Sequence, residues 1–394
     1  MNEVVIVSAV RTAIGRRNGA LSGMRADDLL AKVLRGLVDR VKLDPAQVED
    51  IYCGVVTQVG EQGFVLPRIA ALTAGFPLET PGITVNRQCG SSLTAINLAA
   101  GSIAAGYHDC LIACGCEIMS KFPIAAEWFG LKLADGREAG IPWGPGYMKL
   151  TGGQFVDQGQ AAEMIADKWG LSKEELDAFS LRSHQRAARA VEEGRFKREI
   201  LPLEVTLPDG QKTCFERDET VRPDTSMEKL ASLKPVFGTR IITAGNASPI
   251  TDGASAVLLM SLAKARELGL QPRARLVTCA VAGADPVMML TGPIPATQKV
   301  LKKAGLSIKE MDEIEINEAF APIPLAWGKE LNPDWEKVNP NGGAIALGHP
   351  VGNSGCRLTV TCLHELERTG GRYGMITLCT GGGMAPATII ERMD

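Results

Sequence analysis

The stretch NRQCGSSLTAINLAAGSIAAG at residues 86–106 carries the pattern that decides the fold. Its first four residues follow a short β-branched segment, and small and apolar residues then continue to Gly106. A similar order recurs late in the chain, where residues 353–371 read NSGCRLTVTCLHELERTGG. Both copies predict a helix that begins beside a cysteine and ends at a glycine, the usual C-terminal stop.

A buried strand is predicted after each of these helices, at residues 110–114 and 375–379. Cys89 lies 25 positions before Cys114, and Cys356 lies 23 positions before Cys379. In both copies the second cysteine is followed five positions later by a methionine (114 to 119, and 379 to 384). We therefore predict an α/β protein built from two similar halves whose corresponding loops face one another.

The region from about Ser120 to Ala247 does not fit the repeat. It is rich in glycine, proline and tryptophan at first, and it then predicts one clear helix from Lys173 to Glu193, with Ser172 and Glu175 as a capping box. We interpret it as an inserted loop or cap domain. The predicted division is residues 1–119 for the first half, completed by about 248–270, then 120–247 for the insertion, and 271–394 for the second half.

Composition excludes several classes of protein. The 394 residues are 45% hydrophobic and 22% charged, and a net charge of -3 predicts no nucleic-acid or membrane partner. No apolar stretch reaches the roughly 18 residues of a membrane span. The chain begins without a basic leader, and its ten cysteines are scattered, so we expect reduced thiols and a cytoplasmic location. Their spacing also predicts no metal site.

Cys89 is the first candidate for chemistry. A cysteine at a helix N-terminus feels the positive end of the helix dipole, which lowers the thiol pKa and favours the thiolate. Gly90 after it lets a substrate approach the backbone. The alternative is a buried, inert cysteine, which is the more common fate of a free thiol.

Three further residues are candidates. His349 lies in the glycine-rich segment NPNGGAIALGHP (339–350), where it can activate a thiol or stabilise an oxyanion, although a loop histidine bonded to backbone is equally compatible. Cys379 ends a predicted strand before three glycines, where a thiol can move a proton; the alternative is a core cysteine. Asn317 follows a strand and can orient a water, although asparagine is common in turns.

Together these segments resemble the thiolase family. The matches are NRQCGSS (86–92), NAS (246–248), TGPIPA (291–296), NEAF (317–320), GHP (348–350) and CTGGG (379–383), in family order along almost the whole chain. The resemblance implies the thiolase fold: two βαβαβαββ halves in a five-layer α/β/α/β/α arrangement, with an inserted loop domain.

The resemblance also implies a ping-pong mechanism. Cys89 attacks the 3-keto carbon of a 3-ketoacyl-CoA with help from His349, the C2–C3 bond breaks, Cys379 protonates the acetyl-CoA enolate, and free CoA takes the acyl group. The reverse Claisen condensation uses the same residues. Two oxyanion sites are implied, one from His349 and a water held by Asn317, the other from the N–H groups of Cys89 and Gly381.

The partners implied are CoA thioesters. Arg222, Phe237 and Ser248 align with positions that contact CoA, although each also has an ordinary structural explanation. No permanently bound cofactor is expected, because coenzyme A or acetyl-CoA is a substrate. A homodimer or homotetramer is implied by the resemblance.

Some segments depart from the family pattern. DQG (157–159) stands where short-chain biosynthetic members have His-Met-Gly, Leu290 stands where many have glycine, and Ala385 replaces another glycine. The motif NRQCGSS around Cys89 favours the degradative 3-ketoacyl-CoA type over an acetoacetyl-CoA-forming biosynthetic thiolase. Ketoacyl synthases and sterol-carrier thiolases are disfavoured because Asn317 is not a histidine. A non-catalytic thiolase-fold binding partner remains the alternative of a different class.

Overall fold

The computed structural model describes residues 1–207 and 209–393, so Asp394, the last residue of the predicted second half, lies outside it. The strands are β1 (Val4–Arg11), β2 (Gly15–Arg16), β3 (Asp50–Gly54), β4 (Ile83–Val85), β5 (Cys110–Ile118), β6 (Leu203–Thr206), β7 (Lys212–Phe215), β8 (Thr251–Ser261), β9 (Ala274–Gly283), β10 (Glu313–Ile316), β11 (Tyr373–Thr377) and β12 (Met384–Arg392). The helices are α1 (Ala26–Arg40), α2 (Leu66–Thr73), α3 (Ser91–Ala105), α4 (Pro145–Leu150), α5 (Gln158–Trp169), α6 (Lys173–Glu192), α7 (Met227–Ala231), α8 (Leu262–Glu267), α9 (Pro293–Ala304), α10 (Pro322–Leu331), α11 (Ala344–Leu347) and α12 (Ser354–Thr369).

The large mixed sheet shows the internal repeat. Its strand order is β10-β11-β12-β9-β1-β8-β5-β3-β4. In the first half, β8 pairs antiparallel with β1 and β5, and β5 pairs parallel with β3. In the second half, β12 pairs antiparallel with β9 and β11, and β11 pairs parallel with β10. The counterpart of β4 is only the bridge between Ile314 and Val338, and β1 and β9 join the halves.

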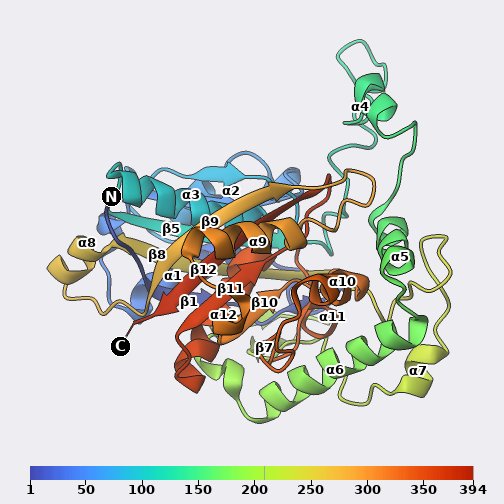
Figure 1. Ribbon diagram of the computed structural model, residues 1–394. Coiled ribbons are helices and arrows are strands. Elements are labelled where there is room, and N and C mark those ends of the chain that lie inside the picture. The colour runs from blue at the N-terminus through green and yellow to red at the C-terminus, as the bar shows by residue number, and fades with distance from the viewer. Residues whose placement is uncertain (208, 394) are drawn as a thin grey trace.

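Apolar packing arranges these elements in layers. Buried side chains of α1 and α2 pack against one face of the first half of the sheet. Those of α3 and α12 form a central cluster between the halves. Those of α9 cover the outer face of β9 and β12 (Figure 1). The α/β/α/β/α order that the family resemblance implies is therefore present.

The repeat-bearing elements form where the sequence predicts them. Helix α3 ends at Gly106 and α12 ends at Gly370, and both glycines have a left-handed backbone, with φ of 80° and 74°. Helix α6 starts with the predicted Ser172 capping box. Strand β8, within the segment 248–270 predicted to complete the first half, pairs with β1 and β5 of that half. The domain limits themselves stay a prediction, which this strand pairing supports.

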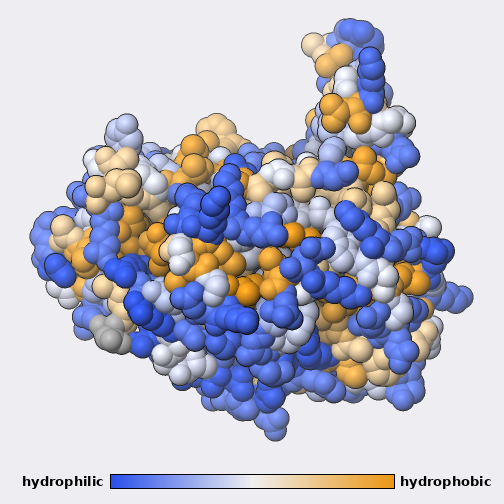
Figure 2. Space-filling model, viewed as in Figure 1, coloured by the Kyte–Doolittle hydropathy of each residue, from blue (hydrophilic) through white to orange (hydrophobic). Residues whose placement is uncertain are grey.

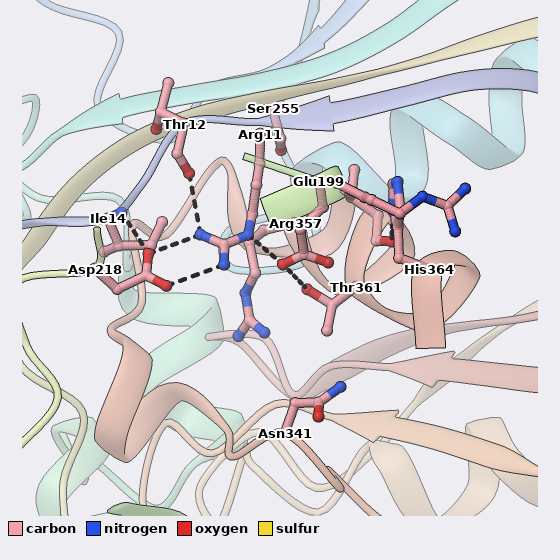
Figure 3. Close-up of polar contacts among 12 residues, drawn as sticks. Arg11, Thr12, Ile14, Glu199, Asp218, Ser255, Asn341, Arg357, Thr361 and His364 are labelled. Carbon is pink, nitrogen blue, oxygen red and sulfur yellow. Dashed lines mark hydrogen bonds and ion pairs between the residues drawn. The ribbon is translucent and has the colours of Figure 1, made fainter. Parts of the chain in front are cut away.

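A buried ion-pair network ties the inserted segment to the core (Figure 3). Arg11, at the end of β1, contacts Glu199 at 2.6 Å and Asp218 at 2.7 Å. Asp218 also accepts a hydrogen bond from the backbone N–H of Ile14, and Glu199 accepts one from the hydroxyl of Thr361 on α12. Burial lowers the pKa of Arg11, but the two carboxylates outweigh it and raise that pKa overall.

An arm that includes α4 projects from the body (Figure 1). Trp143 lies edge-on between Trp128 and Phe155, with ring centroids 4.9 Å apart in both pairs. Several large apolar side chains of the arm are exposed, and Figure 2 shows apolar surface along it. Within residues 1–207 and 209–393, no helix is long and apolar enough to cross a bilayer.

Candidate active site

Cys89 lies in a tight turn between β4 and α3. Gln88 before it has a left-handed backbone with φ of 48°, an uncommon conformation for a residue with a side chain. Gly90 after it has no room for a side chain, because a Cβ there would lie 2.8 Å from both Thr380 and Pro386. This close approach brings the cysteine of the first half against the loop that follows β11 in the second half.

That loop is the glycine-rich turn at residues 380–384. Gly382 and Gly383 have left-handed backbones, with φ of 82° and 77°, and a Cβ at Gly383 would meet the carbonyl of Ala284 at 2.7 Å. The turn directs the backbone N–H of Gly381 toward the sulfur of Cys89, which also accepts a hydrogen bond from its own N–H. Two backbone donors therefore lie next to this sulfur, close to where the oxygen of an attacked carbonyl would lie.

The protonation state of Cys89 differs from the one that the helix dipole predicts. Burial raises the pKa of the Cys89 thiol to about 11, although the backbone donors oppose the shift, and the nearby Glu117 adds to it. Removal from water penalises the thiolate more than the helix terminus favours it. The expectation that Cys89 is a thiolate before substrate binds is therefore wrong. In the protein without substrate the neutral thiol of Cys89 predominates.

His349 is held as a neutral imidazole. Its Nδ1 lies 2.6 Å from the hydroxyl of Ser354, and that hydroxyl donates its proton to the carbonyl of Pro350 at 2.9 Å. Nδ1 therefore carries the ring proton, and Nε2 is an acceptor with its lone pair. Burial, assisted by Arg357, lowers the pKa of His349 to about 3. Without substrate the imidazole of His349 is therefore an unprotonated base, and it does not form an ion pair with a thiolate at Cys89.

Asn317 connects the histidine with the second cysteine. It follows β10, and its Nδ2 lies 3.3 Å from Nε2 of His349. The same side chain hydrogen-bonds to the sulfur of Cys379. Its Oδ1 is buried and has no hydrogen-bond partner among the described residues. A buried acceptor of this kind is a binding position for a polar atom of a substrate or for a water.

Cys379 is fully buried after β11. Burial raises its pKa well above the ordinary thiol value, and the neighbouring Cys89 raises it further. Its apolar surroundings include Leu290 and Ile165. A thiol that holds its proton this firmly is suited to protonate a carbanion, which is a much stronger base.

The four predicted residues Cys89, Cys379, Asn317 and His349 therefore form one connected group. Cys89 interacts with Cys379, Cys379 with Asn317, and Asn317 with His349. The group draws on both halves of the repeat, and residues 351 and 89 also pack together in one small apolar cluster. Sequence patterns did not point to Ser354, which sets the tautomer, nor to Gln158, whose side chain also hydrogen-bonds to Cys89.

Of the residues predicted to contact CoA, Arg222 lines a pocket of about 780 Å³ between the inserted segment and the core. The pocket has four basic side chains, Arg16, Arg17, Arg222 and Lys229. Its two carboxylates already have partners, because Glu219 lies 4.0 Å from Arg16 and Asp224 lies 2.5 Å from Lys229. Basic charge therefore remains for an anionic ligand. Sequence patterns identified Arg222 but missed the other three cations.

The other two predicted CoA contacts pack against residues 319 and 320. Ser248 is flanked by the lining residues Ala247 and Pro249, and its N–H donates to the carbonyl of Ala319 at 2.9 Å. Phe237 has a left-handed backbone with φ of 57° and a ring that is 49% exposed. That ring packs edge-on against Phe320, three residues after Asn317, with centroids 5.9 Å apart. Both positions therefore contact the segment that carries Asn317.

Comparisons with known proteins agree with this geometry. Residues 4–263 match the family model "Thiolase, N-terminal domain", and residues 270–392 match "Thiolase, C-terminal domain". A steroid 3-ketoacyl-CoA thiolase of Mycobacterium tuberculosis is 47% identical over 100% of this chain and 95% of its own length. A 3-ketoacyl-CoA thiolase of Pseudoalteromonas translucida is 45% identical over 100% of both. The crystal structure of the Bacillus anthracis acetyl-CoA acetyltransferase superposes with a TM-score of 0.90 at 40% identity, covering 100% of this chain and 99% of the other.

Proposed function

This chain belongs to the thiolase family and is an acyltransferase, and from that membership we propose the chemistry of its individual residues. The reaction is CoA-dependent cleavage of a 3-ketoacyl-CoA to acyl-CoA and acetyl-CoA, or the reverse condensation, through an acyl group on Cys89. The observation that carries the proposal is a group of side chains from two distant parts of the sequence. The thiols of Cys89 and Cys379 interact electrostatically, and Asn317 hydrogen-bonds to Cys379 and to His349.

Cleavage begins with the neutral pair of Cys89 and His349. Nε2 of His349 accepts the thiol proton as the sulfur attacks the 3-keto carbon. This order follows from the buried site, because a preformed thiolate and imidazolium would both be poorly solvated there. The C2–C3 bond then breaks, its electron pair passes to C2, and the thiol of Cys379 protonates C2. Acetyl-CoA leaves, with the acyl group on Cys89 and the thiolate on Cys379.

The second half-reaction restores both cysteines. Free CoA gives its thiol proton to the Cys379 thiolate, and the CoA sulfur attacks the acyl carbon on Cys89. Cys89 leaves as a thiolate and recovers its proton from His349. Because one thioester is exchanged for another, the step has little free-energy cost. Run backwards, the same steps condense acetyl-CoA with the acyl enzyme.

Two oxyanion sites support these steps. The N–H groups of Cys89 and Gly381 stabilise the oxygen on the carbon that Cys89 attacks. Once His349 is protonated, its Nε2–H and a water bound at Oδ1 of Asn317 stabilise the thioester oxygen of the enolate. Removal of one such donor typically costs about 100- to 1,000-fold in turnover.

We assign CoA to the basic pocket, with Arg222 on a phosphate group and with Ser248 and Phe237 along the path toward Cys89. This assignment follows from charge, because CoA carries several phosphate charges and the pocket has unpaired basic side chains. CoA is a substrate in this scheme, and no permanently bound cofactor has a role.

A homodimer or homotetramer is part of the proposal. Strand β4 is the last strand of the sheet and offers an unpaired edge, and Ile83 on it is 47% exposed. Edges of this kind pair readily with another copy. The apolar arm around α4 offers a second contact surface. Light scattering at micromolar concentration tests this assignment, and a monomer would contradict it.

The substrate is tested with a panel of 3-ketoacyl-CoA thioesters assayed for CoA-dependent cleavage, with products identified by mass spectrometry. Relatives are named steroid 3-ketoacyl-CoA thiolase, 3-ketoacyl-CoA thiolase and acetyl-CoA acetyltransferase. The panel therefore includes acetoacetyl-CoA, which distinguishes a biosynthetic acetyltransferase. Cys89→Ala is the control. Turnover by this variant equal to that of the parent would refute the nucleophile, and no turnover with any thioester would favour a non-catalytic binding protein.

A further inference from the structure

The first turn of α5 places the side chain of Gln158 beside Cys89. Asp157 caps the helix, because its carboxylate accepts from the N–H of Gln160 at 2.9 Å, and its own N–H donates to the Gln160 side chain at 3.2 Å. Gly159 packs directly on the ring of Phe237, where a Cβ would lie 2.4 Å from ring atoms. The backbone of Gln158, between these two anchors, therefore has a fixed position.

The side chain of Gln158 points from this turn into the catalytic group. Its Nε2 lies 3.2 Å from the position that a Cβ on Gly381 would occupy. Its carboxamide also hydrogen-bonds to the sulfur of Cys89. Gln158 thus touches the same sulfur as the N–H groups of Cys89 and Gly381, but it comes from the inserted segment and not from either half of the repeat.

We propose that Gln158 is a further catalytic residue, whose carboxamide N–H is a third donor that stabilises negative charge on the Cys89 sulfur. The proposal rests on the assignment of Cys89 as the nucleophile and deepens it. A donor is needed there because the side chains around the sulfur offer no positive charge to an anion. Glu117 faces it from β5, Cys379 faces it from the second half, and His349 is neutral until a proton reaches it.

The donor has two opposing effects on reactivity, and both are measurable. A hydrogen bond to a charged group corresponds to a pKa shift of about one unit or more. Loss of the donor therefore lowers the thiolate fraction about tenfold at a pH well below the pKa. The remaining thiolate is a stronger nucleophile by about threefold, so the net rate of alkylation falls only about threefold.

The test is alkylation of Cys89 by iodoacetamide at pH 8, followed by mass spectrometry of the Cys89 peptide, in a series at position 158. Gln158→Met keeps the length but has no donor, Gln158→Glu keeps the shape but adds an anion, and Gln158→Lys adds a cation. We expect rates in the order Lys, Gln, Met, Glu, with Met about threefold and Glu at least about tenfold below the parent. The kcat/KM for thiolysis is expected to fall in Met and Glu.

A matched control comes from the same helix turn. Gln160→Glu adds an anion at a position that does not touch the sulfur, and it keeps the capping box because glutamate accepts the same hydrogen bond, so a rate within twofold of the parent is expected. A Met rate equal to the parent's, or a Glu rate no lower than that of Met, would overturn the proposal, because a merely structural role has no dependence on the sign of the charge. Thiolysis by Cys89→Ala separates this failure from a failure of the nucleophile assignment, because only the second would leave turnover in that variant.

Discussion

Replacement of Asn317 by alanine tests the link between the two halves of the site. The change removes the amide N–H groups that reach His349 at 3.3 Å and the sulfur of Cys379. It also removes the buried Oδ1 that we assign to a water in the enolate oxyanion site. His349 loses its orientation at Nε2, and the enolate loses a donor.

The expected magnitude follows from these contacts. Loss of one oxyanion donor costs about 2.7–4 kcal/mol in the transition state, or roughly 100- to 1,000-fold in kcat. Stability is expected to fall by about 1–3 kcal/mol, because a buried amide that makes hydrogen bonds is lost. The loss of activity is therefore not explained by unfolding, because a protein of ordinary stability remains almost entirely folded after a loss of this size.

Two assays separate the effects. Steady-state thiolysis reports kcat, and deuterium exchange into the methyl group of acetyl-CoA reports enolisation by Cys379. Both are expected to fall together in Asn317→Ala. Asn341→Ala is the matched control, because this buried asparagine hydrogen-bonds to Glu365 at 3.0 Å, outside the catalytic group, and its loss is expected to lower stability and leave kcat within a few fold. A kcat for Asn317→Ala within fivefold of the parent would refute the reasoning.

Three other predictions follow from the described contacts. Arg11→Met leaves Glu199 and Asp218 as uncompensated buried charges and is expected to lower the free energy of unfolding by about 3–5 kcal/mol in urea denaturation; a loss below about 1 kcal/mol would contradict this. Because burial raises the pKa of Cys89 to about 11, the neutral thiol persists below that pH. The rate of Cys89 alkylation in the protein without substrate is therefore expected to rise about tenfold per pH unit from pH 7 to pH 10. A rate that does not change with pH would indicate a preformed thiolate. Arg222→Gln is expected to raise the KM for CoA about tenfold with kcat nearly unchanged, since it removes one charge-assisted hydrogen bond to a phosphate; an unchanged KM would place CoA elsewhere.

Local patterns in the sequence were sufficient for the elements of the repeat. Helices α3 and α12 and their glycine stops follow from apolar spacing and from the backbone freedom of glycine, because nothing distant is needed to specify them. The strand that each helix precedes follows from a short β-branched run. The same local patterns put Cys89 just before the helix of the first half and Cys379 just after the strand of the second half.

Features that depend on distant parts of the chain were not predictable in this way. Arg11 pairs with residues 188 and 207 positions away, and no local pattern marks such partners. The predicted effect of the helix dipole on Cys89 is outweighed by burial, whose extent depends on the packing of both halves. Gln158 reaches the sulfur from the inserted segment, and the sequence showed only that this position departs from the family.

The acyl enzyme itself is the most direct test of the account. The protein is incubated with acetyl-CoA, quenched in acid and digested, and each cysteine peptide is then weighed by mass spectrometry. The account predicts the mass of one added acetyl group on the peptide that contains Cys89, lost again when free CoA is added before the quench, and none on the peptide that contains Cys379. An acetyl group found on Cys379, or on no cysteine at all, would contradict it.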